Sequence, residues 1–271
     1  IPAVRLTTIF RQAAESRIVA NAHRVNRGEL PELSTAGSGA ERDFFFLTEE
    51  DPAKLQALIV ELVLRRLPRR YGLDPLTDIQ VLTPMHRGPI GAGQLNAALQ
   101  AALNPPRARV AELVRGGRVY RVGDRVLQQR NNYDKAVFNG DLGRIVAIDA
   151  VRQTVVVRMD DREVPYEYGD LDELAPAYAI TVHKSQGSEY PAVVLPLHTT
   201  HYVMLRRNLL YTAITRARRL LVAVGTRKAM AIAVGNVSGQ DRNSGLAARL
   251  AGVSSVPPRQ QALLDSAQSA G

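Results

Sequence analysis

YAITVHKSQGSEYP, residues 178–191, is the segment from which the rest of this sequence can be interpreted. It leaves a short apolar run, crosses a polar loop, and enters a second apolar run at residues 192–197. In α/β proteins, loops that connect strands in this way carry ligand-binding side chains. The loop offers a lysine, two serines, a glutamine and a glutamate, which suit phosphate and ribose, and a glycine that permits close backbone approach. An ordinary solvated turn has a similar composition, so composition alone leaves both interpretations open.

A second motif, NLLYTAITRAR, follows at residues 208–218. TVHKSQGSEY resembles motif V of superfamily 1 helicases in the form carried by the RecD-like branch, and NLLYTAITRAR is similar to motif VI of the same family. The resemblance covers most of residues 1–250, and it is confined to the second half of a RecD-like motor. It implies the fold class: α/β, with a RecA-like parallel sheet flanked by helices and interrupted by a small all-β SH3-like barrel. It also implies 5′ to 3′ translocation, which no residue here indicates by itself.

Composition describes a globular protein that can hold one large or two modest domains: 271 residues, 45% apolar and 23% charged. No apolar run is long enough to span a bilayer, so we expect no membrane partner. The absence of cysteine excludes disulfides and thiolate zinc sites and fits a reducing compartment, so we expect a cytoplasmic location. Because the chain opens on IPAVRLTTIF, with neither an initiator Met nor a signal peptide, we expect it to begin within a longer protein.

The net charge of +9 and the isoelectric point near 10.1 favour a polyanionic partner. Only four of the 35 basic residues are lysines, and such a bias toward arginine can also reflect genome composition. Charge therefore supports a nucleic-acid partner without establishing one.

Outside residues 107–173, hydrophobic periodicity predicts alternating strands and helices, which are typical of a parallel sheet with helices on both faces. Ser16 is a good N-cap for a helix that stops at Gly28, and Asp51 followed by Pro52 begins another. The expected strands are residues 4–10, 43–47, 78–82, 192–197 and 220–224, the other expected helices are residues 95–102 and 201–217, and residues 65–76 are expected to be a basic connection.

From residue 107 the pattern changes to short β-rich runs separated by Gly, Asn and Asp turn signals. Short strands at this spacing predict a small β-barrel inserted between α/β segments, and the resembling family has its SH3-like insertion at this position. The β-rich runs are residues 119–129, 142–148, 155–159 and 163–166. The expected division is 1–106 and 174–236 for the RecA-like motor domain, 107–173 for the SH3-like insertion, and 237–271 for a loosely ordered tail.

A nucleotide-hydrolysing site needs a phosphate-binding loop with its lysine and an acid that holds Mg²⁺. No Gly-Lys pair occurs anywhere in the sequence, so the G-x-x-x-x-G-K-[ST] loop is absent. The resemblance assigns that loop to a first RecA-like domain that this chain lacks, and it implies that the residues present act from the opposite side. It implies Arg11 and Arg216 as catalytic sensors of the γ-phosphate, and Gln12, Gln186, Gly187 and Glu189 as ATP-binding residues.

Both arginines have simpler interpretations. Arg11 could be a surface arginine in a turn. Arg216 falls on the same face of the predicted helix as Leu205, Leu209 and Ala213, where an unpaired guanidinium would be costly. It therefore needs an anion, which could be a structural carboxylate or the γ-phosphate of a nucleotide.

Several loops are candidates for DNA contact. The segment VLTPMHRGPIGAGQLNAALQAALNP, residues 81–105, is similar to RecD-type sequence that lines a single-strand path, although a solvated loop is an equal alternative. A cation, amides and an aromatic residue at 130–133 suit phosphate contact and base stacking, and are also common in loops. The expected DNA-binding residues are Pro84, Met85, His86, Arg87, Arg130, Asn132, Tyr133, Thr181, His183, Lys184 and Asn208.

The resemblance therefore implies the C-terminal motor half of an ATP-dependent RecD-type DNA helicase that moves along single-stranded DNA. The expected cofactor is ATP with Mg²⁺, whose ligands would lie on the missing N-terminal half. The expected partners are single-stranded DNA, junctions of single- and double-stranded DNA, and the N-terminal RecA-like domain of the same protein. This chain alone is expected to be inactive. Two alternatives stay open: an ATP-independent single-stranded-DNA-binding module, and the helicase region of a conjugative relaxase.

Overall fold

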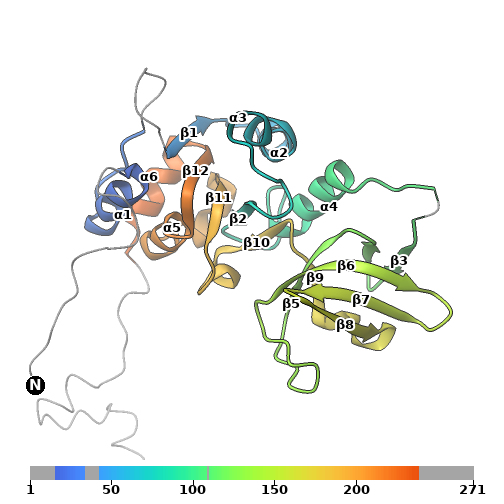
Figure 1. Ribbon diagram of the computed structural model, residues 1–271. Helices are drawn as coiled ribbons and strands as arrows, with labels where there is room; N and C mark the ends of the chain where they lie inside the picture. The colour runs from blue at the N-terminus through green and yellow to red at the C-terminus, as the bar shows by residue number, and fades with distance from the viewer. Residues whose placement is uncertain (1–15, 34–42, 109, 238–271) are drawn as a thin grey trace, which may run out of the picture. The chain divides into compact units, whose positions relative to one another are not determined.

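The computed structural model describes residues 16–33, 43–108 and 110–237. A parallel sheet of five strands forms the centre of the α/β part, in the order β1-β12-β11-β2-β10 (Figure 1). The strands are β1 (Phe44–Thr48), β2 (Ile79–Thr83), β10 (Ala179–Thr181), β11 (Tyr190–Leu197) and β12 (Ala217–Gly225). Strands covered on both faces read as nearly continuous apolar runs, which is why β2, β11 and β12 could be recognised in the sequence.

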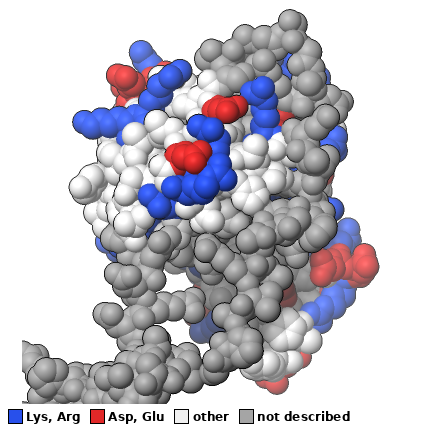
Figure 2. Space-filling view, turned by 90° about the vertical axis from the view of Figure 1, so that its left-hand side faces the viewer, with Lys and Arg blue, Asp and Glu red and all other residues white. Residues whose placement is uncertain are grey.

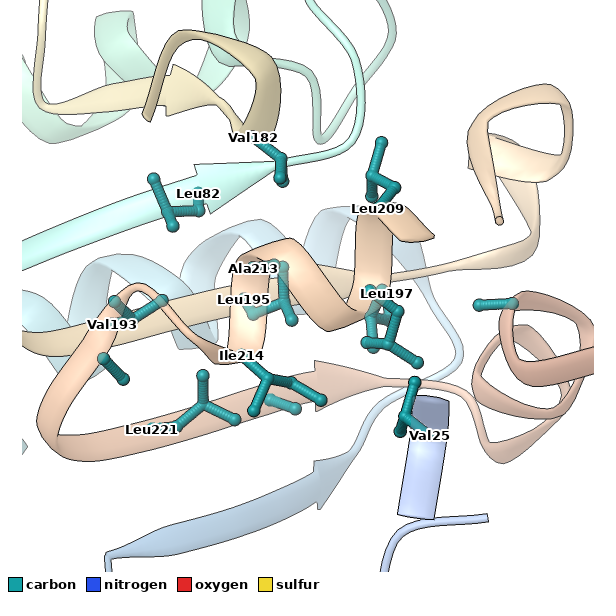
Figure 3. Packing of buried hydrophobic residues seen from close by; sticks show 14 of the residues in the cluster. Val25, Leu82, Val182, Val193, Leu195, Leu197, Leu209, Ala213, Ile214 and Leu221 are labelled. Carbon is teal, nitrogen blue, oxygen red and sulfur yellow. The ribbon is translucent and has the colours of Figure 1, made fainter. Parts of the chain in front are cut away.

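Helices cover both faces of this sheet (Figure 1). One face packs against α1 (Arg17–Arg27), α5 (Arg207–Ile214) and α6 (Arg227–Gly235), and the other against α2 (Pro52–Glu61), α3 (Leu67–Tyr71) and α4 (Ala92–Leu103). Alternate residues of a strand point to opposite faces. Accordingly Val193 and Leu195 of β11 pack toward α5, as Figure 3 shows, while Ala192 and Val194 belong to the other core.

Within the described residues, the regular elements of the insertion are all strands apart from one 3-10 turn, η2 (Tyr168–Glu173). An antiparallel sheet has the order β8-β7-β6-β5-β9, and β3 and β4 form a separate hairpin. The strands are β3 (Glu112–Arg115), β4 (Arg118–Arg121), β5 (Arg125–Gln128), β6 (Leu142–Asp149), β7 (Thr154–Met159), β8 (Arg162–Glu167) and β9 (Leu174–Pro176). The predicted α/β class with a parallel sheet and a small all-β insertion is confirmed. The exact domain boundaries stay a prediction; β9, which pairs with β5, follows the expected boundary at residue 173.

Two expected elements are wrong. The helix expected over residues 201–217 is divided into a 3-10 turn, η4 (Thr199–Met204), and α5, because Leu205 adopts an extended backbone and buries its side chain completely. The connection expected at residues 65–76 is helical as far as Tyr71, through a π turn, η1 (Leu62–Arg66), and α3. Pro68 lies in the first turn of α3, where its missing N–H is tolerated.

The ends of the other helices follow the sequence signals. Ser16 caps α1 and Gly28 ends it with φ of 85°, and the Asp51 side chain accepts hydrogen bonds from two backbone N–H groups at the start of α2. The expected strand at residues 4–10, Arg11, Gln12 and the tail from residue 238 lie outside the described residues.

Candidate functional site

The motif V segment, residues 181–190, runs from the carboxyl ends of the parallel strands, here called the carboxyl edge of the sheet, back to their amino ends, the amino edge. It begins where β10 ends, at Thr181, which lies level with Thr83 at the end of β2. It ends where β11 begins, and Ala192 of β11 lies level with Ile79 at the start of β2. Because these strands are parallel, the first residues of the segment lie at the carboxyl edge of the sheet and the last ones at its amino edge.

Short-range contacts fix the shape of this segment. Residues Val182–Ser185 form a 3-10 turn, η3, in which the buried Ser185 Oγ donates a hydrogen bond to the Val182 carbonyl over 2.7 Å. Gly187 follows with φ of 87°, a conformation that favours glycine. A side chain at this position would meet no atom within 4 Å. The backbone angle explains the glycine, and the open space beside it leaves room for the close approach that the sequence suggests.

Arg216 lies just beyond the end of α5 and is half-buried. Its guanidinium donates hydrogen bonds from Nη1 to the Ser188 carbonyl (2.9 Å), from Nε to the Thr212 carbonyl (3.2 Å) and from Nη2 to Thr215 Oγ1 (3.2 Å). The expectation that Arg216 continues a buried helical face is therefore wrong, because the helix ends at Ile214. All three acceptors are neutral, so the guanidinium is held in place by groups that do not cancel its charge.

A pocket of about 840 Å³ lies beside Arg216. We call it the arginine pocket; it is lined by Ile18, Val19, Ala22, Glu189, Pro191, Tyr211, Thr215, Arg216, Arg218 and Arg219. Three guanidinium groups face one carboxylate in this lining, and Arg218 Nε lies 3.9 Å from Glu189 Oε2. Figure 2 views the side on which α1 lies in Figure 1 and shows basic side chains gathered around acidic ones.

The chemistry of the arginine pocket suits a nucleotide. One guanidinium group can bind two oxygens of a phosphate at once, and a carboxylate accepts hydrogen bonds from ribose hydroxyls. Glu189 and Arg216, which the sequence assigns to this role, are brought together here. Gln186 and Gly187 are exposed and are not part of the described lining, and Arg11 and Gln12 lie outside the described residues.

Asp43 is a structural residue that the sequence reasoning missed. Its carboxylate accepts hydrogen bonds from the Ser16 hydroxyl and from the backbone N–H groups of Arg17 (3.0 Å) and Ile18 (3.4 Å). A carboxylate at this end of a helix also interacts favourably with the helix dipole. The backbone N–H groups in the first turn of α1 are therefore already bound to the Asp43 carboxylate. A ligand in the pocket would meet its side chains instead.

The second group of predicted residues lies at the carboxyl edge of the sheet. His86 and Arg87, in the loop after β2, are exposed, as are His183 and Lys184 in η3, whereas Pro84 is buried. Although the Lys184 side chain reaches the surface, partial desolvation of its ammonium group lowers its pKa, and the nearby positive charge of Arg118 lowers it further.

Other predicted residues adjoin this edge. Thr181 and Met85 are half-buried, and Asn208 is exposed in the first turn of α5, which packs against η3. Figure 3 shows Leu209 of that helix close to Val182 of η3. The structure thus brings the candidates after β2 and β10, and at the start of α5, to one edge.

The third group lies in the insertion loop, residues 129–141, between β5 and β6. Glu173 accepts hydrogen bonds from Gln128 Nε2 (2.8 Å), Arg130 Nη2 (3.1 Å) and Asn132 Nδ2 (3.1 Å). Burial raises the pKa of Glu173, but these hydrogen bonds and the charge of Arg130 outweigh burial and lower it overall. Arg130 and Asn132 therefore have intramolecular partners, and their contact with DNA stays a prediction.

Two aromatic side chains of the insertion loop are free to meet a ligand. Tyr133 is 77% exposed and Phe138 is 47% exposed, and their rings meet edge to face with centroids 6.1 Å apart. Lys184 Nζ donates a hydrogen bond to Gln129 Oε1, at the start of the same loop, over 3.2 Å. Phe138 and Glu173 were missed in the sequence because an exposed aromatic and a buried acid leave no periodic signal.

Among the described residues, no cluster of three or more His, Asp or Glu side chains could hold a metal ion. A search of the same residues finds no helix long and apolar enough to cross a membrane.

Comparison with known sequences agrees with this arrangement. A family model described as the SH3 domain of ATP-dependent RecD-like DNA helicases matches residues 95–159, and a model of the UvrD-like helicase C-terminal domain matches residues 176–224. The chain belongs to the RecD-like helicase family and corresponds to a C-terminal half with its SH3-like insertion.

Individual relatives point the same way. An ATP-dependent RecD2 DNA helicase of Deinococcus radiodurans is 38% identical over 254 residues, which are 92% of this chain and 32% of that protein. The RecD subunit of the RecBCD enzyme of Mycobacterium tuberculosis is 30% identical over 260 residues, 91% of this chain and 42% of that protein. The chain thus spans between about a third and two fifths of the length of these curated relatives.

A solved structure of Pif1 helicase from Bacteroides, in complex with ADP-AlF3 and single-stranded DNA, aligns with 81% of this chain and 51% of that chain. Its TM-score is 0.49 at 19% sequence identity, which is too weak to guide the assignment of function.

Proposed function

We propose that this chain is the second motor half of an ATP-dependent DNA helicase that translocates on single-stranded DNA. ATP with Mg²⁺ would be held by the phosphate-binding loop of an N-terminal RecA-like domain of the same protein, and the arginine pocket would close on it from the other side. The observation that carries this proposal is the 2.9 Å hydrogen bond from Arg216 to the Ser188 carbonyl, because it joins motif VI to motif V beside the pocket.

Arg216 would stabilise the negative charge that develops on the transferred phosphoryl group, with Arg11 as a second cation. Such arginines contribute about 10³ to 10⁵ to the rate in other nucleotide hydrolases. Glu189 would accept a hydrogen bond from a ribose hydroxyl, and Gln12, Gln186 and Gly187 would approach the same nucleotide. The neutral partners of Arg216 support this role, since they orient the fork of the guanidinium and leave its charge available.

The motif V segment would couple nucleotide and DNA. Its last residues adjoin the arginine pocket and its first residues reach the carboxyl edge. Any movement of Arg216 toward a γ-phosphate would pull on the Ser188 carbonyl, and through this short segment on His183 and Lys184. In other nucleotide hydrolases, contacts with the γ-phosphate order loops, and hydrolysis releases them, which switches a binding surface.

The DNA strand would lie along the carboxyl edge. Arg87 and Lys184 would bind phosphates there, and Thr181, His183, His86, Met85, Pro84 and Asn208 would shape the path. On the insertion loop, Tyr133 would stack on a base, with Arg130 and Asn132 beside it. Junctions between single- and double-stranded DNA are the expected substrates for unwinding, and the cytoplasmic location also stays a prediction.

The test is ATP turnover with and without oligo-dT, measured on this chain alone and after mixing with the N-terminal motor domain. We expect no turnover by this chain alone, and DNA-stimulated turnover after mixing. Turnover by the unmixed chain would contradict the division of the site between two halves. Binding of oligo-dT without any nucleotide response in the mixture would favour an ATP-independent binding module instead.

A further inference from the structure

Two consecutive large apolar side chains are exposed on η4. Tyr202 is 66% exposed and Val203 is 73% exposed, whereas His201 before them and Leu205, two residues after Val203, are 1% and 0% exposed. Each exposed residue alone would be ordinary, but two adjacent ones, held in place by a turn anchored by the buried His201 and followed by the buried Leu205, form a small apolar surface. This pair has no role in the sites described so far.

The position of η4 places this pair beside the predicted DNA contacts. It follows the carboxyl end of β11, which lies next to β2, and β2 lies next to β10. Burial and, to a smaller extent, the charge of His198 lower the pKa of His201, the Ile90 backbone partly opposes them, and the net pKa is about 4, so η4 adjoins the loop after β2. Since neighbouring strands are about 4.8 Å apart, the ends of these three strands span about 10 Å, a distance that a short piece of extended strand can cross.

The charges around η4 favour an anionic ligand at the end that carries Tyr202. Arg206 and Arg207 follow directly, and Arg206 Nε is a buried nitrogen without a hydrogen-bond partner among the described residues. At the opposite end of η4, His198 Nε2 lies 2.9 Å from the carbonyl of Glu50, which belongs to an acidic segment, residues 49–51. A polyanion arriving at Tyr202 is therefore directed along β11, β2 and β10 and away from β1.

We propose that Tyr202, supported by Val203, is a stacking platform for one base of the single strand, and that Arg206 binds a phosphate next to it. This inference rests on the proposed function. Aromatic faces with neighbouring cations are the usual means of holding single strands without reading their sequence. The platform extends the DNA path from the loops after β2 and β10 to a third strand end, where no basic loop was expected.

The inference is tested by the affinity of the full protein for a fluorescently labelled oligo-dT, followed by anisotropy. Tyr202→Ala should weaken binding about 5- to 150-fold, the range for loss of one base stack, while Tyr202→Phe should keep the affinity within about twofold. Val151→Ala serves as the matched control, because Val151 is 94% exposed in the turn after β6, away from the carboxyl edge. All three substitutions are at exposed positions and should leave the melting temperature unchanged.

Unchanged affinity of Tyr202→Ala, with normal binding by the unmodified protein, would overturn the platform and leave the proposed function intact. Failure of the unmodified protein to bind oligo-dT would contradict the proposed function itself. If Tyr202→Ala instead kept its DNA affinity and lost association with the N-terminal motor domain, the apolar pair would be a protein-docking surface, and the platform would again be overturned. Equal losses for Tyr202→Phe and Tyr202→Ala would also overturn it, because the hydroxyl and not the ring would then be responsible.

Discussion

The arginine pocket and the insertion loop contain similar residues, but the hydrogen-bond acceptors of their arginines differ in charge. Both combine arginine with acidic or amide side chains beside an open surface. In the pocket, Arg216 donates to backbone carbonyls and a hydroxyl. In the insertion loop, Arg130 donates to the carboxylates of Glu173 and Asp172, at 3.1 and 3.4 Å. The first arginine keeps an uncompensated charge, and the second is largely neutralised within its own domain.

This difference shows what makes a cationic side chain available to an anionic ligand. The charge of its hydrogen-bond acceptors within the protein matters more than how exposed the side chain is. The Arg130 side chain is 58% exposed, yet its hydrogen bond to Glu173 and the charge of Asp172 raise its pKa. Arg216 is less exposed but has only neutral acceptors in the described structure. We therefore expect Arg216 to act on a phosphate, and Arg130 to act mainly on the shape of its loop.

The largest expected effect separates these two arginines by ATP turnover of the whole protein. Arg216→Ala should reduce DNA-stimulated turnover by about 10³ to 10⁵, because the charge on the transferred phosphoryl group loses its cation. Arg130→Ala should reduce it by less than about tenfold, and DNA binding by Arg216→Ala should be largely intact. Steady-state turnover and oligo-dT affinity of both variants check this expectation.

A matched control is Arg227→Ala, since Arg227 is exposed on α6 and is not part of the pocket lining. Near-normal turnover by Arg216→Ala would break the comparison, because the neutral acceptors would then mark a purely structural arginine.

As the pH falls, the α/β part, which carries the arginine pocket, and the insertion should lose stability over different ranges of pH. His201, in the α/β part, has a folded pKa of about 4 against an ordinary value of 6.5. The unfolded chain therefore binds more protons between these values, so stability is fully present above pH 6.5 and is lost as the pH falls toward 4, by about 3 kcal/mol. Thermal melts between pH 7 and 4 measure the effect. His201→Leu should remove this part of the pH dependence, and an unchanged slope would contradict the assignment.

The insertion should respond in a lower range of pH. The pKa of Glu173 is lowered from its ordinary value of 4.5, so its contribution to stability is present above that pH and is lost as the pH falls below it. Glu173→Gln should lower the unfolding free energy of the insertion by about 1–3 kcal/mol at neutral pH, because Arg130 loses its ion pair and an amide faces the amides of Gln128 and Asn132. Urea unfolding followed by hydrogen exchange in β5 and β6 tests this. Asp172→Asn is the control, since the Asp172 side chain is 65% exposed and its contact with Arg130 is longer.

The sequence predicted the sheet, most helix ends and the segment that joins the two edges, because buried strands, caps and motifs are local signals. The caps at Ser16 and Asp51 are examples, since each acts within three residues. The resemblance assigned Arg216 and Glu189 to one nucleotide, and both line the arginine pocket, but the buried helical face expected for Arg216 was wrong, because periodicity could not reveal that α5 ends at Ile214. The acceptors of Arg130 could not be predicted, because Glu173 is 43 residues away in sequence and meets it only after the insertion has folded.

The smallest expected effect compares two residues of the insertion loop by their contributions to DNA affinity. Tyr133→Ala should weaken binding of oligo-dT about 5- to 150-fold, because an exposed ring that can stack on any base is removed. Arg130→Gln should change affinity by less than about threefold, because the charge that is removed is already compensated by Glu173. Repeating both measurements across a range of salt sharpens the test, since a phosphate contact changes the slope of affinity against salt and a stacking contact does not. If Arg130→Gln weakened binding more than Tyr133→Ala, the arginine must leave Glu173 when DNA arrives, and the insertion loop would resemble the arginine pocket after all.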